Sequence, residues 1–179
     1  MPVISDLRPA AGTAGTVPGL RSQIVAFAGF LGLSAAAWVL ASIPIILNST
    51  GWYAGSLKAP WMPPSLMFRI TWMVLYVGVA AAAWLVWRKG GLTGPALAGY
   101  AVQLVLNAAW PAAFFAMYPM AGAAALWAAF LVICTLAATL AFLIVRFGPV
   151  DATAGMLVLP YFSWVVFSAT LNLYAAVHN

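Results

Sequence analysis

The sequence GWYAGSLKAPWMPPSLMFRITWMVLY, residues 51–76, interrupts a chain that otherwise consists of long apolar runs. The prolines at positions 60, 63 and 64 fix φ, lack a backbone N–H and favour extended geometry in the residue before them, so no regular helix passes through them. Aromatic rings and a lysine ammonium are typical of a membrane interface, where such groups lie at headgroup level. We therefore expect a stiff loop that covers one end of a helical bundle as a lid. The residues expected in this lid are Trp52, Lys58, Trp61, Pro63 and Pro64.

The composition excludes a water-soluble domain. Of 179 residues, 66% are hydrophobic and 5% are charged, whereas soluble domains carry about 25% charged residues. The basic residues behind the net charge of +5 lie between apolar runs, which indicates membrane topology rather than nucleic-acid binding. The two carboxylates, Asp6 and Asp151, are far apart in sequence and form no general acid–base pair. With one cysteine, Cys134, and one histidine, His178, neither a disulfide nor a metal site is expected.

Five apolar runs are each long enough to cross a hydrocarbon core of roughly 30 Å as a helix. They lie at residues 24–47, 65–88, 95–117, 120–146 and 152–177. We predict an all-α integral membrane protein, a bundle of five transmembrane helices with a long structured loop between helices 1 and 2. Residues 1–22 are predicted to be a disordered tail, and residues 23–178 a single transmembrane domain.

Smaller features refine this prediction. Pro44 is expected to bend or end the first helix, and Pro160 to break the fifth one early. Cys134, in an Ala-rich span, is interpreted as a small core residue. Tyr118-Pro119 is expected to be a short turn that makes spans three and four antiparallel neighbours.

The distribution of charge predicts an orientation. An odd number of spans places the termini on opposite sides, and the N-terminal side then carries five of the seven basic residues. The positive-inside rule predicts a cytoplasmic N-terminus and an external lid, in a multi-pass protein of the cell membrane.

Polar and aromatic side chains recur at helical spacing on three of the predicted spans. The stripes are Phe68, Trp72 and Tyr76 on the second span, Gln103, Asn107, Trp110 and Phe114 on the third, and Tyr161, Trp164, Ser168 and Asn172 on the fifth. Because lipid cannot satisfy polar groups, such stripes face inward. Together they would line a flat apolar cavity with a few hydrogen-bonding points, typical of a small-molecule site. The alternative is that the amides only bond neighbouring helices and the rings only pack.

Two further patterns each have two readings. Lys58 and Arg69 attract anionic groups such as carboxylates or lipid phosphates, or they only anchor the interface. The small residues Ala121, Ala125 and Ala129 permit close helix approach or dimerisation.

The motifs, taken in order, resemble the translocator protein or tryptophan-rich sensory protein (TspO/MBR) family. The resemblance covers residues 24–175 and rests on Trp52-Tyr53-Ala54-Gly55, Lys58, Trp61, Pro63-Pro64, Phe68, Trp72, Leu75-Tyr76, Gln103-Leu104, Leu106-Asn107, Trp110-Pro111, Phe114-Phe115, Pro160-Tyr161, Trp164 and Thr170-Leu171-Asn172.

This resemblance implies a five-helix bundle, often dimeric, that binds porphyrins and synthetic lipophilic ligands in a cavity under the first loop. By positional match, the residues that would line it are Trp72, Asn107, Trp110, Phe114, Trp164, Ser168 and Leu171. Some bacterial relatives degrade protoporphyrin in light through tryptophans that match Trp72 and Trp164.

The expected function is that of a membrane receptor or binding protein for porphyrins and similar flat lipophiles, with a role in stress or tetrapyrrole regulation. Two alternatives stay open: a light- and oxygen-dependent porphyrin-degrading enzyme that uses Trp72 and Trp164 as catalytic residues, and a transporter of tetrapyrroles or lipids. The expected partners are membrane lipids, a porphyrin-like molecule as ligand or substrate and a second copy of the chain. No cofactor is required.

Overall fold

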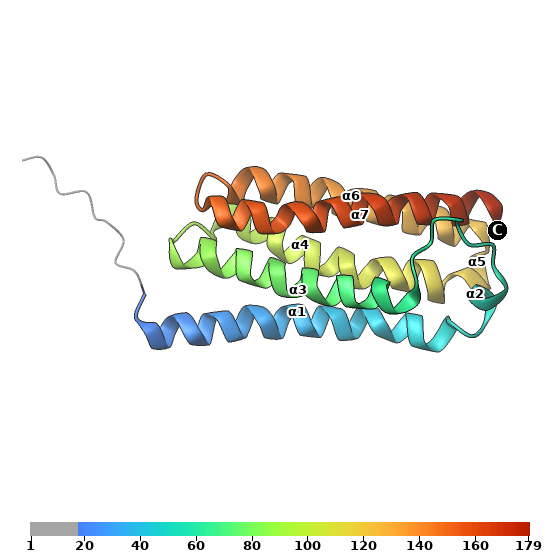
Figure 1. Cartoon of the computed structure of the whole chain (residues 1–179), viewed down its shortest axis with the longest axis horizontal. Helices are drawn as coiled ribbons and strands as arrows, with labels where there is room; N and C mark the ends of the chain where they lie inside the picture. The colour runs from blue at the N-terminus through green and yellow to red at the C-terminus, as the bar shows by residue number, and fades with distance from the viewer. Residues whose placement is uncertain (1–17) are drawn as a thin grey trace, which may run out of the picture.

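The computed structural model describes residues 18–179, so most of the predicted tail, residues 1–17, lies outside the described residues. Five long helices run roughly parallel to one another along the molecule (Figure 1). They are α1 (Leu20–Asn48), α3 (Ser65–Arg88), α4 (Gly94–Pro111), α6 (Ala123–Phe147) and α7 (Ala152–His178). All five are long and apolar enough to cross a membrane. The prediction of an all-α integral membrane protein with five spans is therefore confirmed.

Three short elements join the long helices at one end of the bundle. They are α2 (Trp52–Gly55), the π-helix η1 (Ala112–Ala116) and α5 (Tyr118–Ala121). The expected turn at Tyr118-Pro119 is thus one turn of helix, and Gly122, with φ of 56°, separates it from α6. The positive φ is readily adopted by glycine, which explains why the fourth long helix begins at Ala123 and not near residue 120.

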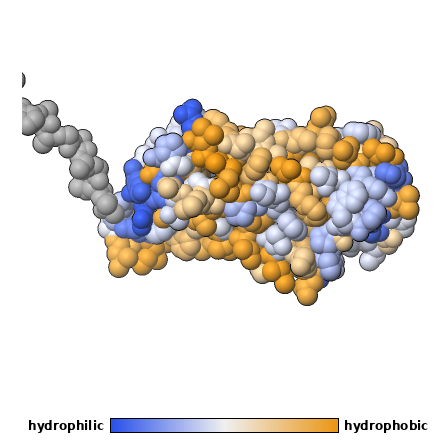
Figure 2. Space-filling view, turned by 45° about the horizontal axis from the view of Figure 1, so that its top comes forward, coloured by the Kyte–Doolittle hydropathy of each residue, from blue (hydrophilic) through white to orange (hydrophobic). Residues whose placement is uncertain are grey.

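The helices form a closed ring. The main contacts between neighbours follow the order α1, α3, α7, α6, α4 and back to α1. On the face that Figure 2 shows, the most hydrophilic residues lie near the two ends of the molecule, and the surface between them is mainly apolar with paler patches. This banded surface is what a bilayer requires, since its core is apolar and both interfaces are wet.

The core is filled mainly by α6 and its neighbours. Leu126, Ile133 and Leu140 on one face of α6 have no exposed surface, and Ala125 and Ala129 are buried with them. These alanines therefore serve close packing inside one chain. The interpretation of Cys134 as a core residue is wrong, because its side chain is exposed on the outer face of α6. A thiol facing lipid and a thiol facing the core give the same apolar sequence pattern.

The first helix does not end at Pro44, and the expected break of the fifth helix at Pro160 is wrong. Pro44 lies inside α1 and Pro160 inside α7, and both helices continue past them. Membrane helices tolerate proline because side chains and neighbouring helices satisfy the backbone groups it frees.

The loop before α3 contains no regular helix from Ser56 to Pro64, as the prolines predict. It crosses from the end of α1 to α3 over the end of the bundle, near the C-terminus (Figure 1). Trp61 donates a hydrogen bond to the Thr170 hydroxyl at 3.2 Å and packs edge-on against Tyr174. At its start the Trp52 indole stacks on Tyr118 and donates to the Phe115 carbonyl at 3.0 Å. The loop is thus fastened to both α7 and the α4–α5 region.

Candidate functional site

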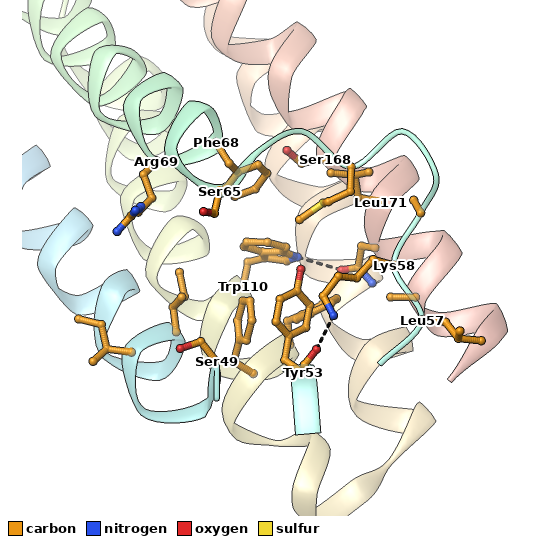
Figure 3. Close-up of a pocket in the computed structure, with 18 residues that line it drawn as sticks. Ser49, Tyr53, Leu57, Lys58, Ser65, Phe68, Arg69, Trp110, Ser168 and Leu171 are labelled. Carbon is orange, nitrogen blue, oxygen red and sulfur yellow. Dashed lines mark hydrogen bonds between the residues drawn. The ribbon is translucent and has the colours of Figure 1, made fainter. Parts of the chain in front are cut away.

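A cavity of about 390 Å³ lies directly beneath this loop. Its walls come from the end of α1, the loop, the first turns of α3, the α4–η1 junction and the C-terminal half of α7 (Figure 3). The lining residues are Ile45, Ile46, Ser49, Tyr53, Leu57, Lys58, Ala59, Met62, Ser65, Phe68, Arg69, Trp110, Phe114, Phe115, Ser168, Leu171, Asn172 and Ala175. We call this space the loop cavity.

A second cavity of about 430 Å³ adjoins the first and lies between α1, α3 and α4. The two share Phe68, Arg69 and Trp110 together with two isoleucines of α1. The second cavity also reaches Trp72, Tyr76 and Asn107 on the inner side, and exposed apolar residues of α1 on the outer side. Both volumes fall in the range of small-molecule sites, and we call this space the groove cavity.

Two stacked indoles form the wall between α3 and α4. Trp72 and Trp110 have ring centroids 6.3 Å apart and planes inclined by only 21°. Phe68 extends the aromatic surface along α3, and Phe114 extends it along the α4–η1 segment. The wall is therefore aromatic, although Phe68 and Phe114 are inclined to the indoles by 60° and 37°, and aromatic faces favour a flat ligand that stacks.

The orientation of Trp110 is fixed by a hydrogen bond across the bundle. Its Nε1–H donates to Asn172 Oδ1 at 2.9 Å, and the Asn172 Nδ2 group donates to the Leu126 carbonyl at 2.9 Å. Asn172 therefore links α4, α7 and α6 while it holds the indole in the cavity wall. Burying a polar group costs free energy unless it is hydrogen-bonded, and here the bonding also positions the ring.

The other amides of the predicted stripes form a buried cluster. The Asn107 side chain donates to Gln103 Oε1 at 3.1 Å and to the Tyr161 hydroxyl. Gln103 and Tyr161 are almost completely buried and line neither cavity, whereas Asn107 lies at the inner edge of the groove cavity. This cluster joins α4 to α7, as interhelical amides do in membranes.

The loop cavity contains few polar groups. Ser168 is buried, and its hydroxyl has no hydrogen-bond partner among residues 18–179. Burial raises the pKa of the Tyr53 hydroxyl, which therefore stays protonated. Lys58 donates to the carbonyls of Tyr53, Ala54 and Ser56 at 2.8 to 3.3 Å, so its ammonium fastens the loop to α2.

The structure separates the predicted site residues into two groups. The predicted residues that line a cavity are Lys58, Phe68, Trp72, Tyr76, Asn107, Trp110, Phe114, Ser168, Leu171 and Asn172. Those that line neither cavity are Trp52, Trp61, Pro63, Pro64, Gln103, Tyr161 and Trp164. Trp164 lies behind the wall, where its ring packs against Phe68 with centroids 5.6 Å apart.

Several lining residues were not predicted. Tyr53 and Phe115 each follow an aromatic residue that the sequence analysis names. The adjacent aromatic pairs Trp52-Tyr53 and Phe114-Phe115 could therefore have indicated that these two residues line the cavity. Phe115 faces the cavity because η1 is a π-helix, which shifts the register by one residue, and such segments often occur at functional sites. The α1 wall, from Trp38 to Ser49, carries no aromatic or amide stripe, because it is mostly apolar and its only lining polar residues are Ser42 and Ser49.

Comparison with known proteins agrees with this architecture. The model of the TspO/MBR family matches residues 22–177. The human translocator protein is 38% identical over 125 residues, which cover 68% of this chain and 70% of the relative. The tryptophan-rich sensory protein of Cereibacter sphaeroides is 34% identical over 146 residues, 82% of this chain and 88% of that protein. The pig translocator protein is 34% identical over 139 residues, 74% and 78% of the two chains.

Proposed function

Because the chain belongs to the TspO/MBR family, we propose that it is a membrane receptor for porphyrins and similar flat lipophilic ligands, bound in the cavities beneath the loop. The observation that carries the proposal is the parallel pair of indoles, Trp72 and Trp110, in the wall of the groove cavity. A planar macrocycle gains most from offset stacking on such a surface.

The shape and polarity of the site agree with this ligand class. The loop cavity is covered by the loop, so a lipophilic ligand there is shielded from water. Ser168 offers an unpaired hydroxyl on the α7 wall. No group of three metal-ligating side chains occurs among residues 18–179, so the proposal assigns the recognition to stacking, shape and a few polar contacts.

Filling the cavity tests the proposal. Protoporphyrin is titrated in the dark into the purified full chain in detergent, and the shift of the porphyrin absorption band is followed. Leu171→Trp places a larger side chain in the loop cavity, and we expect it to weaken binding at least about tenfold, since a filled site must expel the ligand or distort. Leu173→Trp on the exposed face of the same helix is the matched control and should bind like the wild type. The proposal fails if the wild type shows no saturable shift. Saturable binding that Leu171→Trp leaves unchanged would assign the ligand to the groove cavity alone, because Leu171 lines only the loop cavity.

A second function is favoured by the place of one of these indoles. Trp72 lines the groove cavity, and an indole in contact with an illuminated porphyrin can be oxidised or can relay oxidation. Light- and oxygen-dependent porphyrin breakdown then predicts a new absorbing species on illumination in air, absent in the dark and strongly reduced in Trp72→Phe. Binding without any such species assigns the protein to the receptor class.

We propose the same orientation as the charge pattern predicts, with the N-terminus in the cytoplasm and the loop outside the cell membrane. Arg21, Arg88, Lys89 and Arg146 lie near the helix ends that face away from the loop. Attachment of a membrane-impermeant amine reagent to Lys58 in intact cells would support this orientation, and labelling of Lys89 alone would reverse it. We further propose that ligand occupancy reports stress or tetrapyrrole level to the cell.

A further inference from the structure

Arg69 is a charged side chain in an otherwise mostly apolar site. It lies in the second turn of α3, about 6 Å along the helix from Ser65 at 1.5 Å per residue, and it lines both cavities. In Figure 3 its guanidinium points toward the α1 side of the loop cavity rather than toward Trp110. A ligand that occupies both cavities would therefore lie beside this side chain.

The guanidinium has no partner among residues 18–179. It makes neither a hydrogen bond nor an ion pair there, although it carries five N–H donors. The single carboxylate side chain in residues 18–179, Asp151, is paired at 2.9 Å with Lys89 near the other end of the bundle. The other cation of the loop cavity, Lys58, is already occupied by the carbonyls of Tyr53, Ala54 and Ser56. Arg69 is thus the cation at the site whose donors remain available within this part of the chain.

We infer that Arg69 binds the acidic group of the ligand, so that the ligand class is an anionic amphiphile: a flat apolar body against Trp72 and Trp110, and a carboxylate on the guanidinium. This inference rests on the proposed function and narrows it. A guanidinium matches a carboxylate with two parallel hydrogen bonds, and both charges gain when water is partly excluded. A ligand of this kind places its acid at the interface, where the arginine can follow it.

The test compares two porphyrins that differ in charge. Protoporphyrin carries two carboxylates, and its dimethyl ester carries none. Each is titrated in the dark into the full chain in nanodiscs of phosphatidylcholine, for the wild type and for Arg69→Gln. For each porphyrin, the dissociation constant of the variant is divided by that of the wild type. The quantity compared is this factor for the acid divided by the same factor for the ester. This ratio cancels the partition of each porphyrin into the lipid.

We expect a ratio of about ten or more, because a hydrogen-bonded charge pair contributes at least about one decade of affinity. Arg69→Lys should restore only part of the acid binding, since it keeps the charge but not the two parallel hydrogen bonds. Arg88→Gln is the matched control, because it removes a cation from the other end of the same helix, where the guanidinium lies over Trp84. Its ratio should be one.

The outcomes are separable. If the ester binds and the ratio for Arg69→Gln is one, the inference is overturned and the receptor proposal stands. If neither porphyrin binds the wild type saturably, the receptor proposal fails and the inference fails with it. A lipid phosphate is the competing occupant, so the discs are also prepared with phosphatidylglycerol. If Arg69→Gln retains less phosphatidylglycerol than the wild type, and its acid-to-ester ratio is one, the guanidinium binds the lipid headgroup. That result overturns the inference.

Discussion

The side-chain amide of Asn179 pairs with both backbone groups of Leu57. Its Oδ1 accepts from the Leu57 N–H at 2.7 Å, and its Nδ2 donates to the Leu57 carbonyl at 3.1 Å. Leu57 lines the loop cavity, so this contact ties the cover of the cavity to the end of α7. Loosening it should make the cover open more often without changing the walls below.

We therefore expect Asn179→Ala to accelerate both entry and release of a porphyrin. Both hydrogen bonds to Leu57 are lost, each contributing about 0.5–1.5 kcal/mol and less where water replaces them, so both rates should rise about threefold to tenfold. Stopped-flow mixing with protoporphyrin measures them. Ser163→Ala is the control, because that hydroxyl bonds only within α7. Unchanged rates would show that the loop does not limit access to the cavity.

The buried cluster on α4 and α7 predicts a stability defect without a binding defect. Tyr161→Phe removes the hydroxyl that accepts from Asn107 and leaves the amide cluster short of a partner. We expect a loss of about 1–3 kcal/mol, the usual cost of an unsatisfied buried polar group, seen as a lower Tm in detergent. Porphyrin affinity below that temperature should stay within about twofold of the wild type, since Tyr161 lines neither cavity. A large loss of affinity would contradict this separation of roles.

Trp164 should matter less for binding than Trp72. Trp72 lines the groove cavity, whereas Trp164 lies behind Phe68 and its Nε1–H has no partner among residues 18–179. Trp164→Phe keeps a ring in that place and removes an unsatisfied donor, so the dissociation constant for protoporphyrin should stay within about threefold. Trp72→Phe should weaken binding by up to about tenfold through lost stacking. The reverse order, measured by the same titration, would place the ligand between α3 and α7.

The five spans and the loop follow from the sequence because both depend on local features. Length and hydropathy define a span, and three prolines prevent a helix before Ser65. The amides of the stripes were expected to face inward, and Gln103, Asn107 and Asn172 are indeed buried. Lipid cannot bond an amide, so this prediction follows from solvation alone.

What the sequence leaves open is which inward residues reach a cavity. Gln103 and Asn107 lie one turn apart on the same face of α4, yet only Asn107 lines the groove cavity. That difference depends on how closely α7 approaches, which no local pattern encodes. The exposed Cys134 shows the complementary ambiguity, since lipid and protein core are equally apolar.

Close packing near the α6–α7 turn gives a prediction about the fold. A Cβ added to Gly155 would lie 2.9 Å from the Cα of Gly148, which is backbone and cannot rotate away. Gly155→Ala should therefore push α7 from the turn and destabilise the bundle by about 1–3 kcal/mol. Gly32→Ala is the matched control: nothing lies within 4 Å of its added Cβ, and alanine favours a helix. An equal Tm for both variants would contradict the close approach.

The ion pair between Lys89 and Asp151 predicts how stability depends on pH. Hydrogen bonding from Lys89, with a further bond from the Ala154 N–H, lowers the pKa of Asp151 below its ordinary value of 3.8. A carboxyl whose folded pKa is depressed stabilises the fold above its unfolded pKa, and this contribution is lost as pH falls through the folded pKa.

Asp151→Asn keeps a helix-capping side chain but removes the charge. It should lower the Tm only modestly at pH 7, because Lys89 is partly exposed and solvent screens the pair. The difference between the two Tm values should begin to shrink below about pH 4 and disappear as the pH falls through the folded pKa of Asp151. Porphyrin binding should not change, because the pair lies away from both cavities. If the Tm difference between the wild type and Asp151→Asn stays constant down to pH 3, Asp151 stabilises the fold by capping the helix and not by its charge.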